Sequence, residues 1–368
     1  VDGHDVEQLE TVIRWAKEMD TPVLVHVISK KGKGCKYAEE HPDKYHGVGK
    51  FDPKTGAMPD SGPCFSSVFG QKLTQLAEIN HNIVAITAAM CAGTGLTEFS
   101  ERFPQRFFDV GIAEGHAVSM ASGMAKQGLV PVVAIYSGFL QRAYDMLIHD
   151  VSLQNLHVVF CVDRAGLVGT DGETHHGAFD VSYLRSVPHM QILCPASFAE
   201  LEKMLDEAVN KMDGPVAIRY PRGGEGRYAV CDTSPCVKLR SGTDMTICAY
   251  GTTVNAALDA AAILAERGIH SDVFKLSRLD TQPYDDIIAS ISKTGVFMMS
   301  EEVCKASCIA DDILAAAERS GVGLRAAYTP NLGSGIVVQG TVPELLKHCG
   351  LDAQSLADKA EEIVRGGK

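Results

Sequence analysis

The chain has 368 residues, a formal net charge of −12 and 45% hydrophobic residues, without any run of basic side chains. This length predicts two or three domains, and the acidic balance argues against a nucleic-acid-binding surface. No apolar stretch reaches the roughly 20 residues that a membrane-spanning helix needs, and no secretory leader is recognisable, so we expect no membrane association and a cytoplasmic location.

Eleven cysteines are scattered along the chain at irregular spacings, and no two of them form a Cys-x-x-Cys pair. The lack of that spacing argues against a structural zinc site. An odd number of cysteines dispersed over so long a chain fits reduced thiols better than a disulfide framework. This pattern also favours the reducing cytosol.

The first block of the chain comprises residues 1–49. It begins with a helical pattern over 6–19, continues with an apolar strand at 22–28, and then has a loop rich in glycine and lysine at 30–34. An independent domain rarely begins with a helix and a strand that has no preceding partner strand. Proline, glycine and aspartate then predict a linker over residues 50–63.

The second block, residues 64–230, alternates short apolar runs with amphipathic helical stretches. Strands are predicted at 83–87, 106–110, 130–136, 158–162, 191–194 and 215–220. Helical patterns over 140–153 and 198–212 lie between them. Short β-branched runs separated by amphipathic helices predict a parallel sheet with helices on both faces.

A second linker is predicted at residues 231–240, and the third block, 241–368, repeats the alternating pattern. Strands are predicted at 245–249, 271–275, 295–299 and 324–328, and helices at 254–267, 285–292 and 307–319. The fold class is therefore α/β, with two consecutive open, mostly parallel-sheet domains. In such sheets ligands bind beyond the carboxyl ends of the strands, where the polar motifs of this chain fall.

One acidic side chain, Glu114, stands where a predicted strand turns into a helix. It follows the apolar run 107–110 and precedes the small, helical stretch 117–125. A carboxylate in the first turn of a helix is favoured by the helix dipole, so a capping role would be enough to explain Glu114 alone. A second polar group, Tyr136 to Arg142, follows the next strand at the same level, and this favours a functional site.

Five motifs occur in order along the chain. They are Asp109–Val118, Ile135–Asp145, Asp163–Gly166, Thr170–Asp180 and Arg219–Gly223. With them the chain resembles the 1-deoxy-D-xylulose-5-phosphate synthase family of transketolase-like thiamine-diphosphate enzymes. The resemblance extends from Val1 to about Ile363 and implies a pyrimidine-binding domain, then a transketolase C-terminal domain, preceded by a remnant of the diphosphate-binding domain.

For the cofactor, the resemblance implies that Glu114 assists proton transfer at the aminopyrimidine ring of thiamine diphosphate. Such a role needs a carboxylate in a dry pocket. Phe139 would stack on the same ring, and Ile112 and Arg142 would also bind the cofactor. Most phenylalanines are ordinary core residues, but the polar neighbours of Phe139 favour the cofactor.

For the substrates, the resemblance assigns Tyr136, Arg164 and Arg222 to the phosphate of glyceraldehyde 3-phosphate, with Arg142 nearby. Arginine binds phosphate through two parallel hydrogen bonds, so several converging arginines suit a sugar phosphate. A single arginine taken alone is more often a solvated surface charge. The convergence is therefore implied by the resemblance and not by spacing.

Two histidine positions also match the family's active site. His175, in a glycine-rich loop, would bind the pyruvate-derived part of the reacting complex and help to transfer a proton, with Asp171 beside it. His46 matches a further active-site histidine. The pair His175–His176 could also suggest a metal site, but no third ligand at helical spacing supports that reading.

The family binds the cofactor's diphosphate through Mg2+, which is held by a Gly-Asp-Gly motif followed by an asparagine. This chain has no Gly-Asp-Gly and no phosphate-binding loop that could replace it. We therefore expect no metal site in this chain, and expect the diphosphate and Mg2+ sites in a missing N-terminal domain. The intact protein, by resemblance a homodimer, would condense pyruvate with glyceraldehyde 3-phosphate to 1-deoxy-D-xylulose 5-phosphate and CO2, and this chain alone would be inactive.

Two alternatives stay open at this point. A transketolase, or the β subunit of a 2-oxo-acid dehydrogenase, would share the glutamate and the two-sheet plan, although the loop 163–180 favours the synthase. A non-catalytic dimerisation or regulatory paralogue would explain departures from the family pattern at Gly115, at Gly138 and in the run 300–305, which lacks the glycines expected after its glutamate pair. The retained reactive side chains favour the enzyme.

Overall fold

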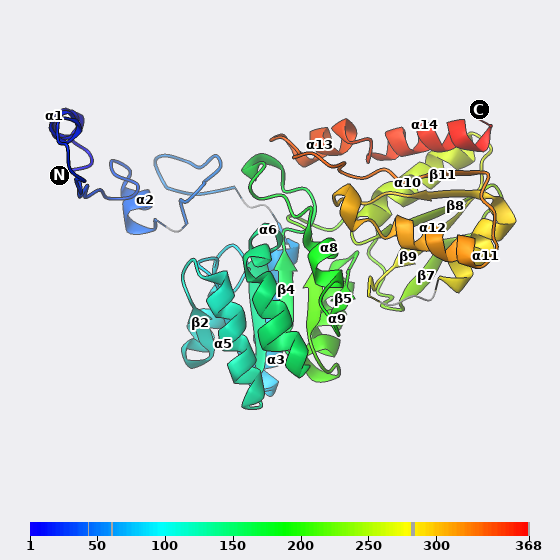
Figure 1. Ribbon diagram of the computed structural model, residues 1–368, viewed down its shortest axis with the longest axis horizontal. Coiled ribbons are helices and arrows are strands. Elements are labelled where there is room, and N and C mark those ends of the chain that lie inside the picture. The colour runs from blue at the N-terminus through cyan, green and yellow to red at the C-terminus, as the bar shows by residue number, and fades with distance from the viewer. Residues whose placement is uncertain (43, 60–61, 281–283, 367–368) are drawn as a thin grey trace. The chain divides into compact units, whose positions relative to one another are not determined.

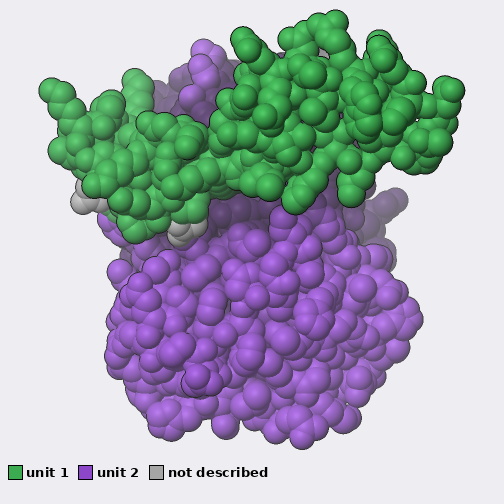
Figure 2. Space-filling model, turned by 90° about the vertical axis from the view of Figure 1, so that its left-hand side faces the viewer, with its two compact units in different colours: residues 1–62 green, residues 63–368 purple. Residues whose placement is uncertain are grey.

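The computed structural model describes residues 1–42, 44–59, 62–280 and 284–366. The chain divides into two compact units, residues 1–62 and residues 63–368 (Figure 2). The second unit holds both sheets and all but one of the residues to which a cofactor or substrate role is assigned above.

The first unit contains two helices, α1 (Val6–Lys17) and α2 (Lys36–Glu40). Helix α1 begins at Asp5, whose carboxylate accepts the Gln8 N–H at 2.9 Å, a favourable N-cap. The strand predicted at 22–28 is wrong, because the described part of this unit offers it only an isolated bridge between Asp2 and Ile28. A strand needs a paired neighbour along its length, and apolar composition alone does not supply one.

The second unit begins with a parallel sheet of six strands in the order β2-β1-β3-β4-β6-β5 (Figure 1). The strands are β1 (Ile83–Thr87), β2 (Phe107–Asp109), β3 (Val130–Tyr136), β4 (Val159–Asp163), β5 (Gln191–Leu193) and β6 (Val216–Arg219). Every residue of β1 and β4 is buried, as expected for strands covered on both faces. All six predicted strands of this block are confirmed to within one or two residues.

Helices cover both faces of this sheet. One apolar cluster packs α3 (Phe65–Ile79), α4 (Thr97–Arg102) and α9 (Phe198–Asn210) against residues such as Ile83. Another packs α5 (Glu114–Lys126) and α8 (Asp180–Arg185) against the opposite face, which includes Ile86. A short turn, η1 (Pro104–Arg106), leads into β2.

The helix predicted over 140–153 is a series of short turns of different types instead of one regular helix. They are α6 (Ser137–Leu140), η2 (Gln141–Ala143), α7 (Tyr144–Met146), the π-helical η3 (Leu147–Val151) and η4 (Ser152–Gln154). The last turn ends at Asn155, which adopts a left-handed conformation with φ +48°. Asparagine tolerates this conformation better than most residues.

The second sheet has five strands in the order β11-β10-β8-β9-β7. They are β7 (Cys236–Arg240), β8 (Met245–Tyr250), β9 (Ser271–Leu276), β10 (Val296–Met299) and β11 (Ala326–Tyr328). Strand β7 is antiparallel to β9, and the other pairs are parallel. The segment 231–240, predicted as a linker, therefore contains an edge strand, because an edge strand needs only one partner and β9 provides it.

Within the described residues, five α-helices accompany the second sheet. Helices α10 (Thr253–Glu266) and α14 (Ala353–Val364) share one apolar cluster with β8, β9 and β10. Helices α11 (Asp285–Thr294) and α12 (Ala310–Arg319) belong to the cluster that also lines the first sheet, so one continuous core connects the two sheets. The turn η6 (Lys305–Ser307) precedes α12, and α13 (Val342–His348) lies between β11 and α14.

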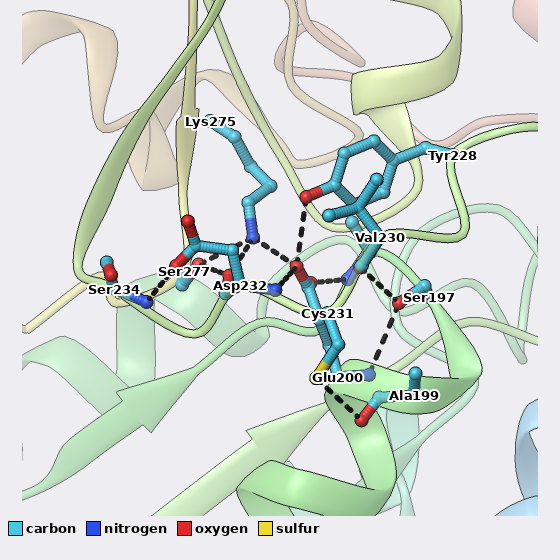
Figure 3. A network of polar contacts seen from close by, with 11 residues as sticks. Ser197, Ala199, Glu200, Tyr228, Val230, Cys231, Asp232, Ser234, Lys275 and Ser277 are labelled. Carbon is cyan, nitrogen blue, oxygen red and sulfur yellow. Dashed lines mark hydrogen bonds and ion pairs between the residues drawn. The ribbon is translucent and has the colours of Figure 1, made fainter.

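Polar contacts also join the two sheets. Lys275 of β9 is completely buried, and its ammonium donates to the carboxylate of the equally buried Glu200 of α9 (Figure 3). The same ammonium donates to the Asp232 carbonyl at 2.6 Å and to the Ser277 hydroxyl at 2.9 Å. Since Asp232 lies in the connection between the sheets, three parts of the chain meet at one buried charge.

Main-chain hydrogen bonds continue this junction along the edge of the first sheet. The Cys194 N–H donates to the Ser277 carbonyl at 2.9 Å, and the Leu279 N–H donates to the Ile192 carbonyl at 3.0 Å.

Within the described ranges, no helix is long and apolar enough to cross a membrane, and the cysteines form no disulfide.

Candidate functional site

The predicted site residues of the second unit cluster at the carboxyl edge of the first sheet. Strand β2 leads to Glu114, β3 to Phe139, β4 to Arg164 and β6 to Arg222. Because these strands are parallel neighbours, their following loops converge on one side of the sheet.

Glu114 is the first residue of α5 and is only 3% exposed. The Arg142 guanidinium donates to its Oε1 at 2.6 Å. About half of the Arg142 side chain is exposed, so the arginine connects a buried carboxylate to the open edge of the site. Among the described residues, the Glu114 carboxylate is hydrogen-bonded through Oε1.

Phe139 forms the centre of a group of rings. Its ring lies 5.7 Å from that of Tyr136, with 29° between the planes, and 5.1 Å from that of His175 in an edge-on arrangement. The Arg142 guanidinium lies 4.9 Å from the Phe139 centroid. These contacts bring together four of the residues that the sequence assigned to cofactor and substrate binding.

Arg164 lies over the Tyr136 ring, 3.7 Å from its centroid. Its backbone is left-handed, with φ +61°, an uncommon conformation that a site can impose on a residue. The guanidinium donates to the Gly93 carbonyl at 2.9 Å and to Asp163 at 3.1 Å. Its Nε is buried and has no protein partner within the described residues.

Asp163 is a site residue for which the sequence analysis assigned no role. It is completely buried, and burial raises the pKa of its carboxyl to about 6, although Arg164 and a hydrogen bond from the Ser66 hydroxyl at 2.7 Å oppose the shift. Its position beside Arg164 at the end of β4 is the signal that could have identified it. Burial likewise raises the pKa of the Tyr136 hydroxyl.

Arg222 and Asp171 form an ion pair at 2.6 Å. Arg222 also donates to the carbonyl of Val168 at 3.2 Å, so one arginine connects the end of β6 with the loop that follows β4. Asp171 ends the short turn η5 (Gly169–Asp171) in that loop. The two residues that the sequence placed near the substrate are therefore direct partners.

The two adjacent histidines have different surroundings. His175 Nδ1 lies 2.9 Å from the Thr174 hydroxyl, and its ring contacts Phe139. His176 is buried, accepts the Val168 N–H at 3.2 Å through Nδ1, and lies 3.3 Å from the Val338 carbonyl through Nε2. His176 therefore has a structural position in the loop, whereas His175 faces the ring group.

Two further predicted residues have surroundings of their own. Ile112 is 82% exposed in the loop before α5. His46 lies in the first unit, where its Nδ1 contacts the Lys31 ammonium. No group of three or more histidine, cysteine or acidic side chains that could hold a metal ion occurs in the described parts of the chain.

Two protein-family models match the chain. The transketolase pyrimidine-binding domain matches residues 62–224, and the transketolase C-terminal domain matches residues 235–356. The first match contains the ring group, the three arginines and the loop with Asp171 and His175. The second contains the five-stranded sheet and extends from β7 to the first turn of α14.

Curated relatives are similar over the length of the chain. A 1-deoxy-D-xylulose-5-phosphate synthase of Natranaerobius thermophilus is 42% identical over 375 residues, covering 100% of this chain and 59% of the relative. The enzyme of the same name from Desulforudis audaxviator is 54% identical over 280 residues, covering 74% of this chain and 44% of the relative. The chain thus spans about half the length of these relatives.

Solved structures share the fold. A split gene transketolase, described as an inactive beta4 tetramer, superposes with a TM-score of 0.73 at 25% identity, covering 83% of this chain and 99% of that one. A Pichia stipitis transketolase in complex with sedoheptulose 7-phosphate gives a TM-score of 0.67 at 15% identity, covering 83% of this chain and 46% of the other.

Proposed function

The chain belongs to the transketolase family, whose pyrimidine-binding and C-terminal domains it matches, and because its curated relatives are 1-deoxy-D-xylulose-5-phosphate synthases, we propose that it forms part of such a synthase. The whole enzyme would condense pyruvate with glyceraldehyde 3-phosphate and release CO2. The product would be 1-deoxy-D-xylulose 5-phosphate, a precursor for isoprenoids, thiamine and pyridoxol.

The residues of the site fit the pyrimidine half of thiamine diphosphate. When bound, this cofactor would supply the electron sink that the decarboxylation of pyruvate requires. Glu114 would interact with a ring nitrogen of the cofactor through its buried carboxylate. Phe139 would offer a flat surface for the ring, while Arg142 keeps Glu114 in place.

The substrate side would depend on arginine. Arg164 and Arg222 would bind the phosphate of glyceraldehyde 3-phosphate with Tyr136, and the buried, unpartnered Nε of Arg164 supports an anionic ligand. His175 would transfer a proton close to the ring group, and Asp171 would orient Arg222. Loss of the phosphate would therefore weaken binding more than loss of a hydroxyl.

Further parts of the proposal concern the assembly. The diphosphate and Mg2+ would bind to the part of the relatives that this chain does not cover. His46 would contribute from residues 1–49, the remnant of the diphosphate-binding domain. A first domain at residues 64–230, a second domain that includes β7 and ends at residue 368, a homodimer and a cytoplasmic location complete the proposal. The description of the split gene transketolase as inactive supports an inactive isolated chain.

The observation that carries the proposal is the buried Glu114 with its Arg142 partner beside the Phe139 ring group. Calorimetric titration of the purified chain with thiamine diphosphate and Mg2+ tests it, and we expect no detectable binding. After restoration of the missing segment from a relative, the enzyme should make product from pyruvate and glyceraldehyde 3-phosphate, and Glu114→Gln should abolish this activity. A near-normal rate for that variant would remove Glu114 from the mechanism.

A further inference from the structure

Two adjacent glutamates, Glu301 and Glu302, follow β10 and make contacts in different directions. Glu301 is completely buried and accepts the N–H groups of Ile309 at 2.7 Å and Ala310 at 3.1 Å, at the beginning of α12. It also accepts the Tyr250 hydroxyl at 3.1 Å. All these partners belong to the second sheet and its helices, so Glu301 stabilises its own domain.

Glu302 instead reaches the loop that follows β4 in the first sheet. Its Oε2 accepts the Leu167 N–H at 3.1 Å. The preceding residue, Gly166, has φ +78°, and a Cβ atom added there would collide with the same oxygen. The glycine therefore permits both the left-handed turn and the close approach of the carboxylate.

The hydrogen bond at Leu167 lies next to the contacts that set the substrate side of the site. The following residue, Val168, donates its N–H to His176 and offers its carbonyl to Arg222. Arg222 in turn pairs with Asp171. A displacement at Leu167 would consequently be passed to both the histidine pair and the arginine.

Other contacts of the same loop also come from the C-terminal domain. The Cys304 N–H donates to the Ala178 carbonyl at 2.9 Å, and the Gln339 side chain donates to the Thr170 carbonyl at 2.7 Å. An apolar cluster joins Leu167 and Ala178 to leucines at 332, 345 and 351. Glu302 supplies the one charged side chain among the contacts described here, and hydrogen bonds to charged groups are stronger than neutral ones.

We propose that Glu302 is a positioning residue that holds the loop carrying Asp171 and His175 in its binding geometry. The C-terminal domain would thereby take part in recognition of the phosphate-bearing substrate, which the family assigns to the first sheet. This inference rests on the proposed function for its kinetic consequence. Its structural part can be tested without any activity.

The structural test is hydrogen–deuterium exchange of the purified 368-residue chain. Glu302→Ala should accelerate exchange in peptides covering Leu167 by about tenfold, because a charged hydrogen bond is lost. Glu302→Gln keeps an acceptor oxygen and should stay within about threefold of the parent chain. The matched control, Glu301→Ala, should accelerate exchange at the start of α12 and leave Leu167 unchanged. Unchanged exchange at Leu167 in Glu302→Ala, or equal acceleration in the control, would overturn the proposal.

The kinetic test uses the complete enzyme. Glu302→Ala should raise the KM for glyceraldehyde 3-phosphate about tenfold and, because His175 lies on the same loop, also lower kcat, and Glu302→Gln should restore both. The same variant should change the KM for unphosphorylated glyceraldehyde much less, because the loop affects substrate binding through Arg222, which binds the phosphate. A uniform loss of kcat in Glu302→Ala and Glu301→Ala would indicate general destabilisation and refute positioning. An inactive parent enzyme would refute the proposed function, while the exchange experiment would still decide the role of Glu302 in the loop.

Discussion

Replacing Lys275 with methionine would measure how strongly the buried junction holds the two sheets together. Methionine keeps much of the apolar stem but removes the ammonium, which donates to Glu200, to the Asp232 carbonyl and to the Ser277 hydroxyl. All three acceptors would then lose a donor. The Glu200 carboxylate, with 0% of its side chain exposed, would lose its only cationic partner in the described ion pairs.

Removing one partner of a buried ion pair costs about 3–5 kcal/mol. Three other donors would still reach Glu200, namely the Tyr228 hydroxyl at 3.1 Å, the Ala196 N–H at 2.8 Å and the Asp232 N–H at 3.3 Å. These donors offset part of the cost of leaving the buried Glu200 carboxylate without a cation, so we expect a loss of about 3 kcal/mol in the free energy of unfolding. Combining the change with Glu200→Gln removes the charge and should recover at least about half of that loss.

The assay is urea unfolding of the 368-residue chain at neutral pH, followed by far-UV circular dichroism, with midpoints compared at a common slope. Lys359→Met is the matched control, because its pair with Glu362 at 2.7 Å lies on the surface. Surface pairs contribute about 0–1 kcal/mol. A loss below about 1 kcal/mol for Lys275→Met, or one equal to the control, would refute the view that this junction is a major source of stability.

Three further changes probe other parts of the molecule. Burial raises the pKa of Glu301 to about 7, so the folded chain keeps a proton that the unfolded chain releases between about pH 4.5 and 7, and stability falls as the pH rises through that window. In Glu301→Gln the free energy of unfolding should fall by up to about 3 kcal/mol less over the same pH range. If the urea midpoints of variant and parent depended on pH in the same way, this prediction would be contradicted. In α3, a Cβ at Gly70 would overlap a backbone carbonyl oxygen, so Gly70→Ala should lower the free energy of unfolding by about 1–3 kcal/mol. In α5, a Cβ at Gly123 would meet nothing within 4 Å, so Gly123→Ala should raise it by about 0.5–1 kcal/mol. Similar melting temperatures for the two variants would contradict this contrast. Asp180→Asn removes the charge that accepts two hydrogen bonds from the buried Arg219 guanidinium, at 2.9 and 3.2 Å, and should lower stability by about 3 kcal/mol, which a thermal midpoint within 2 °C of the parent would exclude.

The parallel strands were predictable because both of their faces are buried. Such strands appear in the sequence as short, continuous apolar runs between helical patterns, as at Ile83–Thr87. The same reasoning was wrong at 22–28, where an apolar run has no adequate partner. At 231–240 it missed a strand, because β7 forms by pairing with β9 and its own composition does not indicate a strand.

The residue types of the site were accessible from the sequence, but their partners were not. Glu114 and Arg142 were both singled out, yet only the fold brings Arg142 within 2.6 Å of that carboxylate. The sequence analysis noted Glu302 only as part of a glutamate pair that lacks the expected glycines after it, and its partner at Leu167 lies 135 positions away in the chain. Contacts between a side chain and a distant backbone group leave no local pattern in the sequence.

The position of β7 bears on how this gene can be divided for expression. The second sheet takes its edge strand from Cys236–Arg240, and the carbonyl of Asp232 just before it receives a buried ammonium from β9. A fragment that begins at the boundary predicted from the sequence, residue 241, would lack β7, expose the backbone of β9 and promote aggregation through that open edge. A soluble fragment of the second sheet should therefore begin before Asp232, and even then it would carry Lys275 without its carboxylate partner.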